Sequence, residues 1–395
     1  MARIPTTRVT GRGRQHGASI VEVMVGILIG LIVVAVIYNV LIVAEGFRRS
    51  TLGVADAQVT GQLSQFVIGR ELANAGNGVM SGEGVDVLAN CSLAGLRPMP
   101  VLIEDSVVGD TPAGASVLND RITLFYSNSP RIVHPVRVDI PAQVATTDPI
   151  TVVSPNGFSV NDWFIAADRA TTDCTMGQVT GMAQPLPAGG AYPPAAPGGF
   201  VALTFTKKAG VDHAYPTLSS RVVNLGRNVT RTTYSIDPAK WQLNSTDENP
   251  GLAAAAAAAP LAQNVVLLKA QYGVDTNNDQ IPDCWTPADN TDTCGVGLDF
   301  SKAFFTGGAP ANLAARIRAI KAVRVALVVR SEDVAKADAA NATLVNQSAW
   351  IFNCAANDAT CQGRIQLDNT ILQDYGRYRI YEATIPLRNA IWNQS

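Results

Sequence analysis

The chain has 395 residues, enough for a membrane element together with one large or two small domains. Its formal net charge of −2 gives no overall basic field of the kind that attracts nucleic acid. Charged residues make up only 16 %, and there are 33 glycines and 22 prolines, a profile that favours a loop-rich, strand-rich exported protein over a compact α/β enzyme.

The N-terminal segment, residues 1–17, is basic and contains no acidic residue. Its arginines are Arg3, Arg8, Arg12 and Arg14. A segment of this charge stays on the cytoplasmic side of a membrane. The run from Val23 to Ala44 then contains no formal charge. As a helix it is about 33 Å long, which matches a hydrocarbon core of about 30 Å, so the sequence predicts one membrane-spanning helix.

A single carboxylate, Glu22, directly precedes this apolar run. Two interpretations of Glu22 remain open. It lies among the lipid headgroups, where it also suits a helix N-terminus, or it pairs with a cation. Cleavage between Gly17 and Ala18 would create that cation, the new α-amino group of Ala18. The pair would then set the register of helices that pack side by side.

The segment "GASIVE", Gly17 to Glu22, followed by the apolar run, resembles the class III signal of type IV prepilins. The resemblance implies that a prepilin peptidase cuts between Gly17 and Ala18. It also implies that Ala18 is N-methylated and that Glu22 guides docking into a growing filament. Ala18 departs from the phenylalanine or methionine that is usual at the methylated position.

Beyond Glu45 the apolar pattern becomes one-sided. Apolar residues recur at steps of three and four at Leu52, Ala55, Val59, Leu63 and Phe66. This spacing predicts an amphipathic helix whose apolar stripe covers a sheet. The sequence "NAGNG", residues 74–78, predicts its end. We therefore expect a leader over 1–17, a membrane or filament-core helix over 18–44 and a packing helix over 45–78.

The remainder, residues 79–395, is dominated by strand patterns. Strands are predicted over 121–127, 131–140, 200–206, 230–236, 265–274, 322–331 and 378–389. The last two alternate most clearly, so each is expected to bury one face.

Three C-terminal segments, "AQYGVDTNNDQIPDCW", "IKAVRVALVVRSED" and "RYRIYEATIPLRN", resemble blocks of the PilW-type minor pilins in the same order, and "RELANAGNG" resembles the end of their long helix. The implied fold is α+β and type IV pilin-like. A long N-terminal helix, membrane-spanning in its first half, packs on an antiparallel β-rich domain with loop insertions. Residues 81–260 match no block and are interpreted as an insertion.

The same resemblance implies a minor pilin that takes part in the initiation of pilus assembly and lies at or near the tip. Its expected partners are other minor pilins, the major pilin, the prepilin peptidase, the inner-membrane assembly platform and a tip adhesin. It implies a single-pass protein of the bacterial inner membrane with a cytoplasmic N-terminus, which then moves into the pilus.

All six cysteines follow the apolar segment, and an even number on the exported side favours three disulfides. The short loops favour Cys284 with Cys294 and Cys354 with Cys361, which leaves Cys91 with Cys174. A metal site is less favoured, because there is no CxxC and few histidines follow the leader.

An acidic loop follows the strand at 265–274. Asp275, Asn277, Asp279 and Asp283 stand at alternate positions, with the carbonyl of Ile281 between them. Hard oxygen ligands at this spacing suit Ca²⁺. Asp and Asn also stabilise turns without a metal, so a calcium loop and a bare hairpin turn both remain open.

No GxSxG, HExxH, Walker A or dinucleotide motif occurs, so the sequence predicts no enzyme. Two other functions remain as alternatives. One is a minor pseudopilin of a type II secretion tip complex, and the other is an adhesive or DNA-uptake pilin. Nucleic-acid binding is not expected, because the exported basic segment, residues 315–324, is interpreted as one charged face of a helix.

Overall fold

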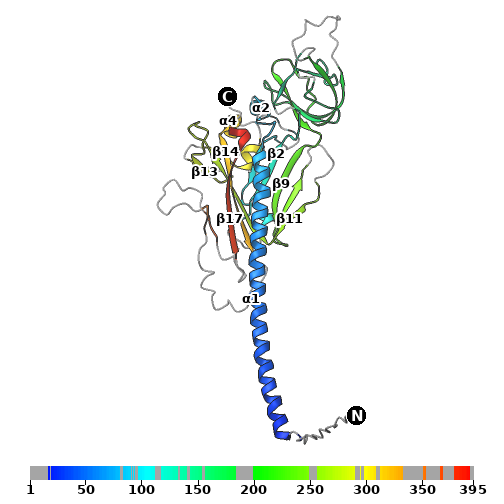
Figure 1. Cartoon of the computed structure of the whole chain (residues 1–395). Coiled ribbons are helices and arrows are strands. Elements are labelled where there is room, and N and C mark those ends of the chain that lie inside the picture. Colours follow the sequence, from blue (N-terminus) through cyan, green and yellow to red (C-terminus); the bar gives the residue numbers. More distant parts are fainter. Residues whose placement is uncertain are drawn as a thin grey trace, which may run out of the picture. The chain divides into compact units, whose positions relative to one another are not determined.

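The structure, a computed structural model, describes most of the chain. The described residues are 17, 19–80, 83–89, 91, 93, 97–111, 117–131, 134–139, 143–153, 156–183, 199–248, 256–289, 294, 298–307, 312–331, 350–352, 365–367 and 378–391. The chain divides into two compact units, residues 1–52 and 53–395. Helix α1, Ile20–Asn74, contributes to both units, and the described strands belong to the second (Figure 1).

Helix α1 is 55 residues long and contains no proline. It begins after Ser19, whose hydroxyl oxygen accepts a hydrogen bond from the Val21 N–H at 3.3 Å. It ends at Asn74 because Gly76 and Gly78 adopt φ values of +76° and +73°, a left-handed backbone that glycine takes without strain. The predicted stop at residues 74–78 therefore lies where the helix ends.

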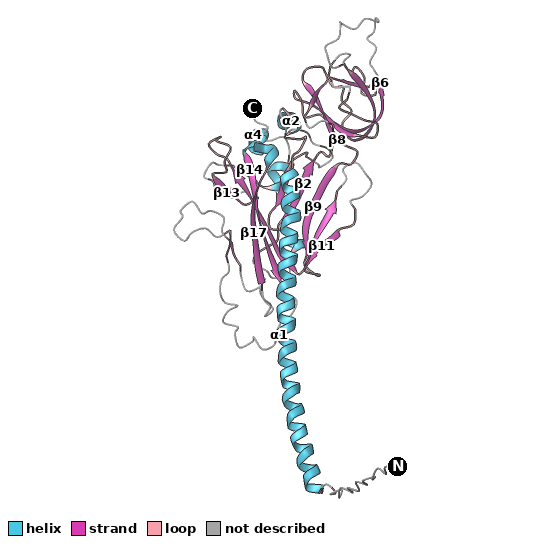
Figure 2. Ribbon diagram, viewed as in Figure 1, coloured by secondary structure: helices cyan, strands magenta, loops and turns pink. Residues whose placement is uncertain are grey.

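A four-stranded antiparallel sheet packs against the second half of α1. Its order is β13 (Cys284–Thr286), β12 (Val265–Val274), β14 (Ile320–Arg330) and β17 (Tyr378–Pro386) (Figure 2). The central strand β14 is buried from Ile320 to Val329. Its odd-numbered valines belong to the helix-facing core, whereas Ala326 and Val328 pack against Ile351 and Leu367 on the other face. The expectation that residues 322–331 bury only one face is therefore wrong, because both faces of this strand are covered.

A five-stranded antiparallel sheet lies beside it. Its order is β1 (Val101–Glu104), β2 (Arg121–Tyr126), β9 (Thr230–Asp237), β10 (Gln242–Asp247) and β11 (Ala259–Gln263). Asn264, with φ +61°, separates β11 from β12 and lets the chain pass from one sheet to the other. The two sheets are also joined through Asn119, whose side-chain oxygen accepts the Leu268 N–H at 2.8 Å.

Between β2 and β9 the chain forms a six-stranded antiparallel barrel. Its order is β3 (Val136–Arg137), β8 (Ser220–Gly226), β5 (Trp163–Asp168), β6 (Cys174–Ala183), β7 (Val201–Gly210) and β4 (Ile150–Val152). A bridge between Val138 and Val152 closes it. The inside is apolar and includes Phe164 and Leu203, which are fully buried. Of the expected insertion over 81–260, only residues 136–226 form this barrel, since β1 and β2 share a sheet with β9 to β11.

Short elements complete the second unit. They are α2 (Gly84–Leu88), the 3-10 turn η1 (Val108–Asp110), α3 (Lys302–Thr306), α4 (Leu313–Ala319), α5 (Arg388–Ile391) and the paired strands β15 (Trp350–Ile351) and β16 (Ile365–Gln366). The long N-terminal helix followed by an antiparallel β-rich domain confirms the α+β fold class.

Candidate functional site

The first turn of α1 holds the residues of the prepilin-like signal. Gly17 and Glu22 are exposed, and Glu22 is the acidic residue of that turn. Ala18 lies outside the described residues, so its amino group is not placed relative to Glu22. The role of Ser19 was not predicted, although Ser19-Ile20-Val21-Glu22 has the S-x-x-E pattern of a capping box. The Ser19 hydroxyl caps the helix through the Val21 N–H, one residue before the N–H that a capping box would use.

The helix segment that follows Glu22 is exposed and apolar throughout its length. Over the described chain, α1 is the helix that is long and apolar enough to cross a membrane. Large apolar side chains from Val23 to Val43 each keep about half or more of their surface accessible. A continuous apolar surface of this size is unfavourable in water and favourable in a bilayer or against other helices. The segment therefore requires a membrane or a helical neighbour.

The second half of α1 has two chemically different faces, and the sequence-based assignment of those faces is wrong. The stripe Leu52, Ala55, Val59, Leu63 and Phe66, expected to cover the sheet, is largely exposed. Val59, Leu63 and Phe66 are 64 %, 53 % and 65 % exposed. The face that packs on the sheet instead consists largely of small residues. It is formed by Ala57, Gly61, Ser64, Ile68 and Leu72.

Small residues line the sheet-facing side of α1 because the helix lies very close to β17. A Cβ built on Gly61 would lie 2.1 Å from Cε2 of Tyr381, so the tyrosine ring occupies the space that a larger helix residue would need. The Tyr381 hydroxyl donates a hydrogen bond to the Ala57 carbonyl at 3.4 Å. Close packing selects small residues on this face, and the large apolar side chains are left on the opposite one.

A groove of about 450 Å³ lies between the end of α1 and the end of β17. It is lined by Gln65, Phe66, Gly69, Arg70, Ala73 and Asn74 from the helix and by Thr384, Ile385, Pro386 and Arg388 from the C-terminal segment. Apolar groups form most of its surface, and Arg70 and Arg388 supply its two positive charges. The groove could not be predicted from the sequence, because its two walls are far apart in the chain.

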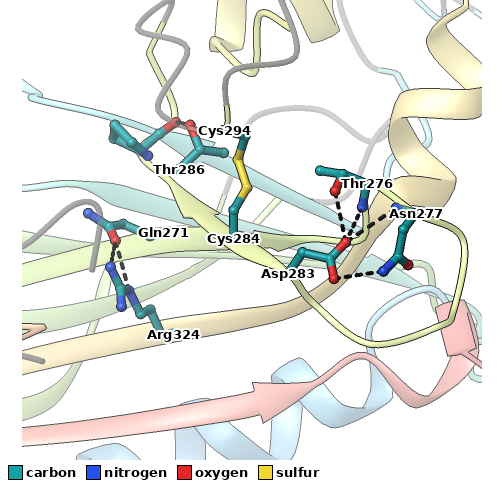
Figure 3. Close-up of a disulfide and its surroundings, with 9 residues drawn as sticks. Gln271, Thr276, Asn277, Asp283, Cys284, Thr286, Cys294 and Arg324 are labelled. Atoms are coloured by element: carbon teal, nitrogen blue, oxygen red, sulfur yellow. Dashed lines mark hydrogen bonds between the residues drawn. A yellow bond between two sulfur atoms is a disulfide. The ribbon is translucent and has the colours of Figure 1, made fainter. Parts of the chain in front are cut away.

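The acidic loop after β12 is closed by hydrogen bonds to the main chain. The Asp275 carboxylate accepts from the N–H groups of Asn278, Asp279 and Gln280 at 2.6, 3.2 and 2.9 Å. Asp283 accepts from the N–H and hydroxyl of Thr276 and from the N–H of Asn277 (Figure 3). These bonds lower the pKa of Asp283. They account for both carboxylates as turn-forming groups.

The other three calcium candidates in this loop are Asn277, Asp279 and Ile281. The Asn277 side-chain amide donates to Asp279 and Asp283 at 3.1 and 3.2 Å. Asp279 accepts the Ile281 N–H at 2.8 Å, and Ile281 is largely exposed. Among the described residues no group of three or more acidic, histidine or cysteine side chains could hold a metal ion. The hydrogen bonds account for a turn without a metal, and calcium binding by this loop stays a prediction.

Two disulfides join the cysteine pairs that the spacing favoured. Cys91 is bonded to Cys174, which links the segment after α2 to β6 of the barrel. Cys284 is bonded to Cys294 next to the acidic loop (Figure 3). The third expected pair, Cys354 with Cys361, lies outside the described residues. Disulfides of this kind belong to the exported, oxidising side of a membrane.

One buried ionic cluster joins the two sheets. The Lys269 ammonium contacts Asp105 at 2.9 Å and also contacts Asp120, which is fully buried. Burial raises the pKa of Asp120 to about 7, against the opposing effect of the Lys269 charge. Burial also acts to raise the pKa of Asp105, but the charge and hydrogen bond of Lys269 lower it overall. The Lys269 ammonium thus contacts two carboxyl groups, and the more deeply buried one, Asp120, has the higher pKa.

The architecture described above defines the class of protein: a long N-terminal helix, apolar and exposed in its first half, with an antiparallel β-rich domain on its second half, is a type IV pilin-like fold. Residues 229–389, from the start of β9 to α5, match the family model of type IV pilus-assembly protein W, PilW. This region of the chain is therefore similar to the PilW family. No curated protein and no solved structure matches it.

Proposed function

We infer that this protein is a minor pilin that takes part in the initiation of type IV pilus assembly and lies at or near the pilus tip. The match of residues 229–389 to the PilW family associates the chain with pilus assembly in general. The observation that carries the finer proposal is the exposed apolar helix that follows Gly17 and Glu22, because a helix of this kind can leave a bilayer only for a similarly apolar environment. A filament core built from neighbouring helices supplies that environment.

The proposed first step is processing by the prepilin peptidase between Gly17 and Ala18, with N-methylation of Ala18. Removal of the arginine-rich leader leaves a helix whose N-terminus carries one amine. Glu22, in the first helical turn, is the acid available to pair with such an amine in the same or a neighbouring chain. Pairing neutralises a charge whose burial in an apolar assembly would otherwise cost several kcal/mol.

The proposed partners are the sister minor pilins, the major pilin, the inner-membrane assembly platform and a tip adhesin. The PilW match supports a pilus over the type II secretion pseudopilus, which was the alternative from the same fold class. The proposed location is the inner membrane with the N-terminus in the cytoplasm, followed by the pilus.

Two measurements test this function. Intact-mass analysis of membrane-extracted protein is expected to show the loss of residues 1–17 and the addition of a methyl group, and a chain that keeps its leader would contradict the proposal. Glu22→Ala is expected to leave the protein stable in the membrane and to impair piliation. The matched control is Glu45→Ala, which removes another exposed acid of the same helix, paired with Arg49 at 3.1 Å, and is expected to preserve piliation.

A further inference from the structure

A buried lysine lies between two acids at the place where the two sheets of the second unit meet. Asp105 follows β1 and Asp120 precedes β2, and the pairing of Glu104 with Arg121 places the two acids side by side at one end of that strand pair. Lys269 comes from β12 of the other sheet, and its ammonium contacts both carboxyl groups. Asp120 and Lys269 are almost completely buried, so bulk water is kept away from their contact.

The main chain holds the carboxyl group of Asp120 in one position. Its Oδ2 atom accepts a hydrogen bond from the Ala270 N–H at 2.8 Å, and its Oδ1 atom accepts one from the Ser106 N–H at 3.1 Å. N–H groups aimed at both oxygens stabilise the negative charge that develops on oxygen when a nucleophile adds to the carboxyl carbon. The Lys269 ammonium contacts the same Oδ1 atom. A nitrogen and a polarised carboxyl carbon are therefore held next to each other.

We propose that Lys269 and Asp120 form an amide bond between their side chains, with Asp105 as the group that moves the protons. The Lys269 ammonium gives a proton to the Asp105 carboxylate, and the neutral Nζ attacks the side-chain carbon of protonated Asp120. Asp105 passes its proton to the departing hydroxyl, which leaves as water when the C–O bond breaks, and then takes the second proton from the nitrogen.

The reaction is balanced without a co-reactant. One ammonium, one carboxylate and one carboxylic acid become one amide, one water and protonated Asp105, with no net change in charge. The inference concerns a covalent bond within the chain and goes beyond the proposed function. The bond ties the five-stranded sheet to the four-stranded sheet, between residues 149 positions apart in the sequence.

The surroundings favour this bond. Burying charged groups is costly, and the amide replaces a buried ammonium by a neutral group. Well-oriented groups within one molecule react as if at an effective concentration of about 10⁵–10⁸ M. Burial also raises the pKa of Asp120 to about 7, so a large fraction of chains at neutral pH has the protonated carboxyl group that can lose water.

The lysine sets the pace of the reaction. Burial acts to lower the pKa of Lys269, but the charges of Asp120 and Asp105 raise it overall. The neutral amine is therefore scarce, and the bond forms slowly after folding. In the bonded chain Lys269 and Asp120 carry no charge, so the acid–base behaviour of this cluster belongs to the freshly folded chain.

Mass spectrometry of the full-length protein in detergent tests the bond. Samples taken directly after purification and after several days at neutral pH are reduced and alkylated, so that disulfides do not affect the mass. A growing fraction is expected to be lighter by one water, and its proteolysis is expected to yield a peptide in which Lys269 is joined to Asp120. Lys302 and Glu104, a more exposed pair at 2.7 Å beside the cluster, are the internal control and are expected to stay unjoined.

Two variants separate the roles of the residues. Lys269→Arg keeps a cation beside both acids but offers no amine that forms the bond, and Asp105→Asn keeps the shape of the side chain but accepts no proton. Each is expected to retain the mass of the unreacted chain after the same incubation, with a cooperative melting curve as evidence of folding. The unmodified chain decides whether the bond exists, even if a variant fails to fold.

Several results would overturn the proposal. They are the absence of the peptide that joins Lys269 to Asp120, a loss of water without that peptide, and a bond from Lys269 to Asp105 instead. Undiminished formation of the joined peptide in Asp105→Asn would also overturn it. Leader cleavage and piliation do not enter this measurement, so its failure is distinguishable from a failure of the proposed function.

Discussion

The ring of Tyr381 occupies the position where Gly61 of α1 would carry a Cβ, at 2.1 Å from that position to Cε2. Gly61→Ala is therefore expected to lower the free energy of unfolding by about 1–3 kcal/mol, because the ring has to move out of a packed interface. Thermal unfolding of the full chain in detergent measures this change. The same substitution at Gly69, where the Cβ meets only Ile385 at 3.7 Å, is the matched control and is expected to be neutral or slightly stabilising.

A double variant distinguishes crowding from a backbone effect. If Tyr381 is the cause, Gly61→Ala combined with Tyr381→Ala loses less stability than the sum of the two single variants. Additive losses would show that the tyrosine ring is not what excludes a side chain at position 61.

The cluster of Lys269, Asp105 and Asp120 predicts a pH dependence. The pKa of Asp120 is raised to about 7 in the folded chain, above the value of about 3.9 for an unfolded aspartate. The folded state thus binds the proton more tightly, and this contribution to stability is lost as the pH rises from about 4 to about 7. Asp120→Asn carries no titrating proton at this position. The stability advantage of the unmodified chain over this variant is expected to shrink across that range.

Melting temperatures of both chains at intervals between about pH 4 and about pH 8 test this expectation. If the melting temperature of the unmodified chain rose relative to that of Asp120→Asn as the pH increased, Asp120 would be ionised and stabilised by Lys269 throughout this range. The exposed pair of Glu45 and Arg49, at 3.1 Å, provides a control in which Glu45→Gln changes the profile little.

The two disulfides are expected to differ in their contribution to stability. They close loops with sequence separations of 83 and 10 residues. In the chain-entropy model the longer loop contributes about 2 kcal/mol more. Replacing Cys91 and Cys174 by alanine should therefore lower the melting temperature more than replacing Cys284 and Cys294. If both replacements lowered the melting temperature equally, strain in the folded state or residual structure in the unfolded state would determine the stabilisation more than loop closure does.

Asp275 is expected to stabilise its loop without calcium. It is buried, and it accepts three main-chain hydrogen bonds that Asp275→Ala leaves unsatisfied, at a cost of about 1–3 kcal/mol. The decrease in melting temperature should be the same with calcium and with a chelator. A calcium-dependent rise in the unmodified chain that the variant lacks would establish a metal site instead. Asp212→Ala, which removes an exposed acid paired with Lys207, is the control.

Local pattern was enough to predict several elements. The strand predicted over residues 265–274 has the same bounds as β12, because ten residues with an apolar, β-branched start and no glycine or proline before Gly273 leave few alternatives. The long helix and its end at residues 74–78 were also predictable from local pattern. The helix ends where the backbone becomes left-handed, and Gly76 and Gly78 adopt that conformation without strain. The docking role of Glu22 stays a prediction, based on the rarity of an acid beside a long apolar run.

Other features depend on contacts between distant residues. Periodicity identified a stripe containing Val59 and Phe66 but could not say which side of the helix meets the sheet, because that depends on Tyr381. The barrel requires Val138 to meet Val152, and neither β5 nor β6 was expected from the pattern. The groove joins Gly69 to Arg388 across most of the chain. Contacts between residues that are far apart in the chain cannot be predicted from any short segment of the sequence.

The place where the barrel enters the fold has a further consequence. It is inserted between β2 and β9, and the last residue of β2, Tyr126, pairs directly with the first residue of β9, Thr230. Both ends of the insert thus leave the five-stranded sheet at one hairpin, where a tight turn would serve the sheet equally well. The barrel is in this sense a module added at one hairpin of the sheet. Its removal would leave the pairing of β2 with β9 possible, but it would also remove the disulfide partner of Cys91 and expose Val87 and Leu88, which pack against the barrel.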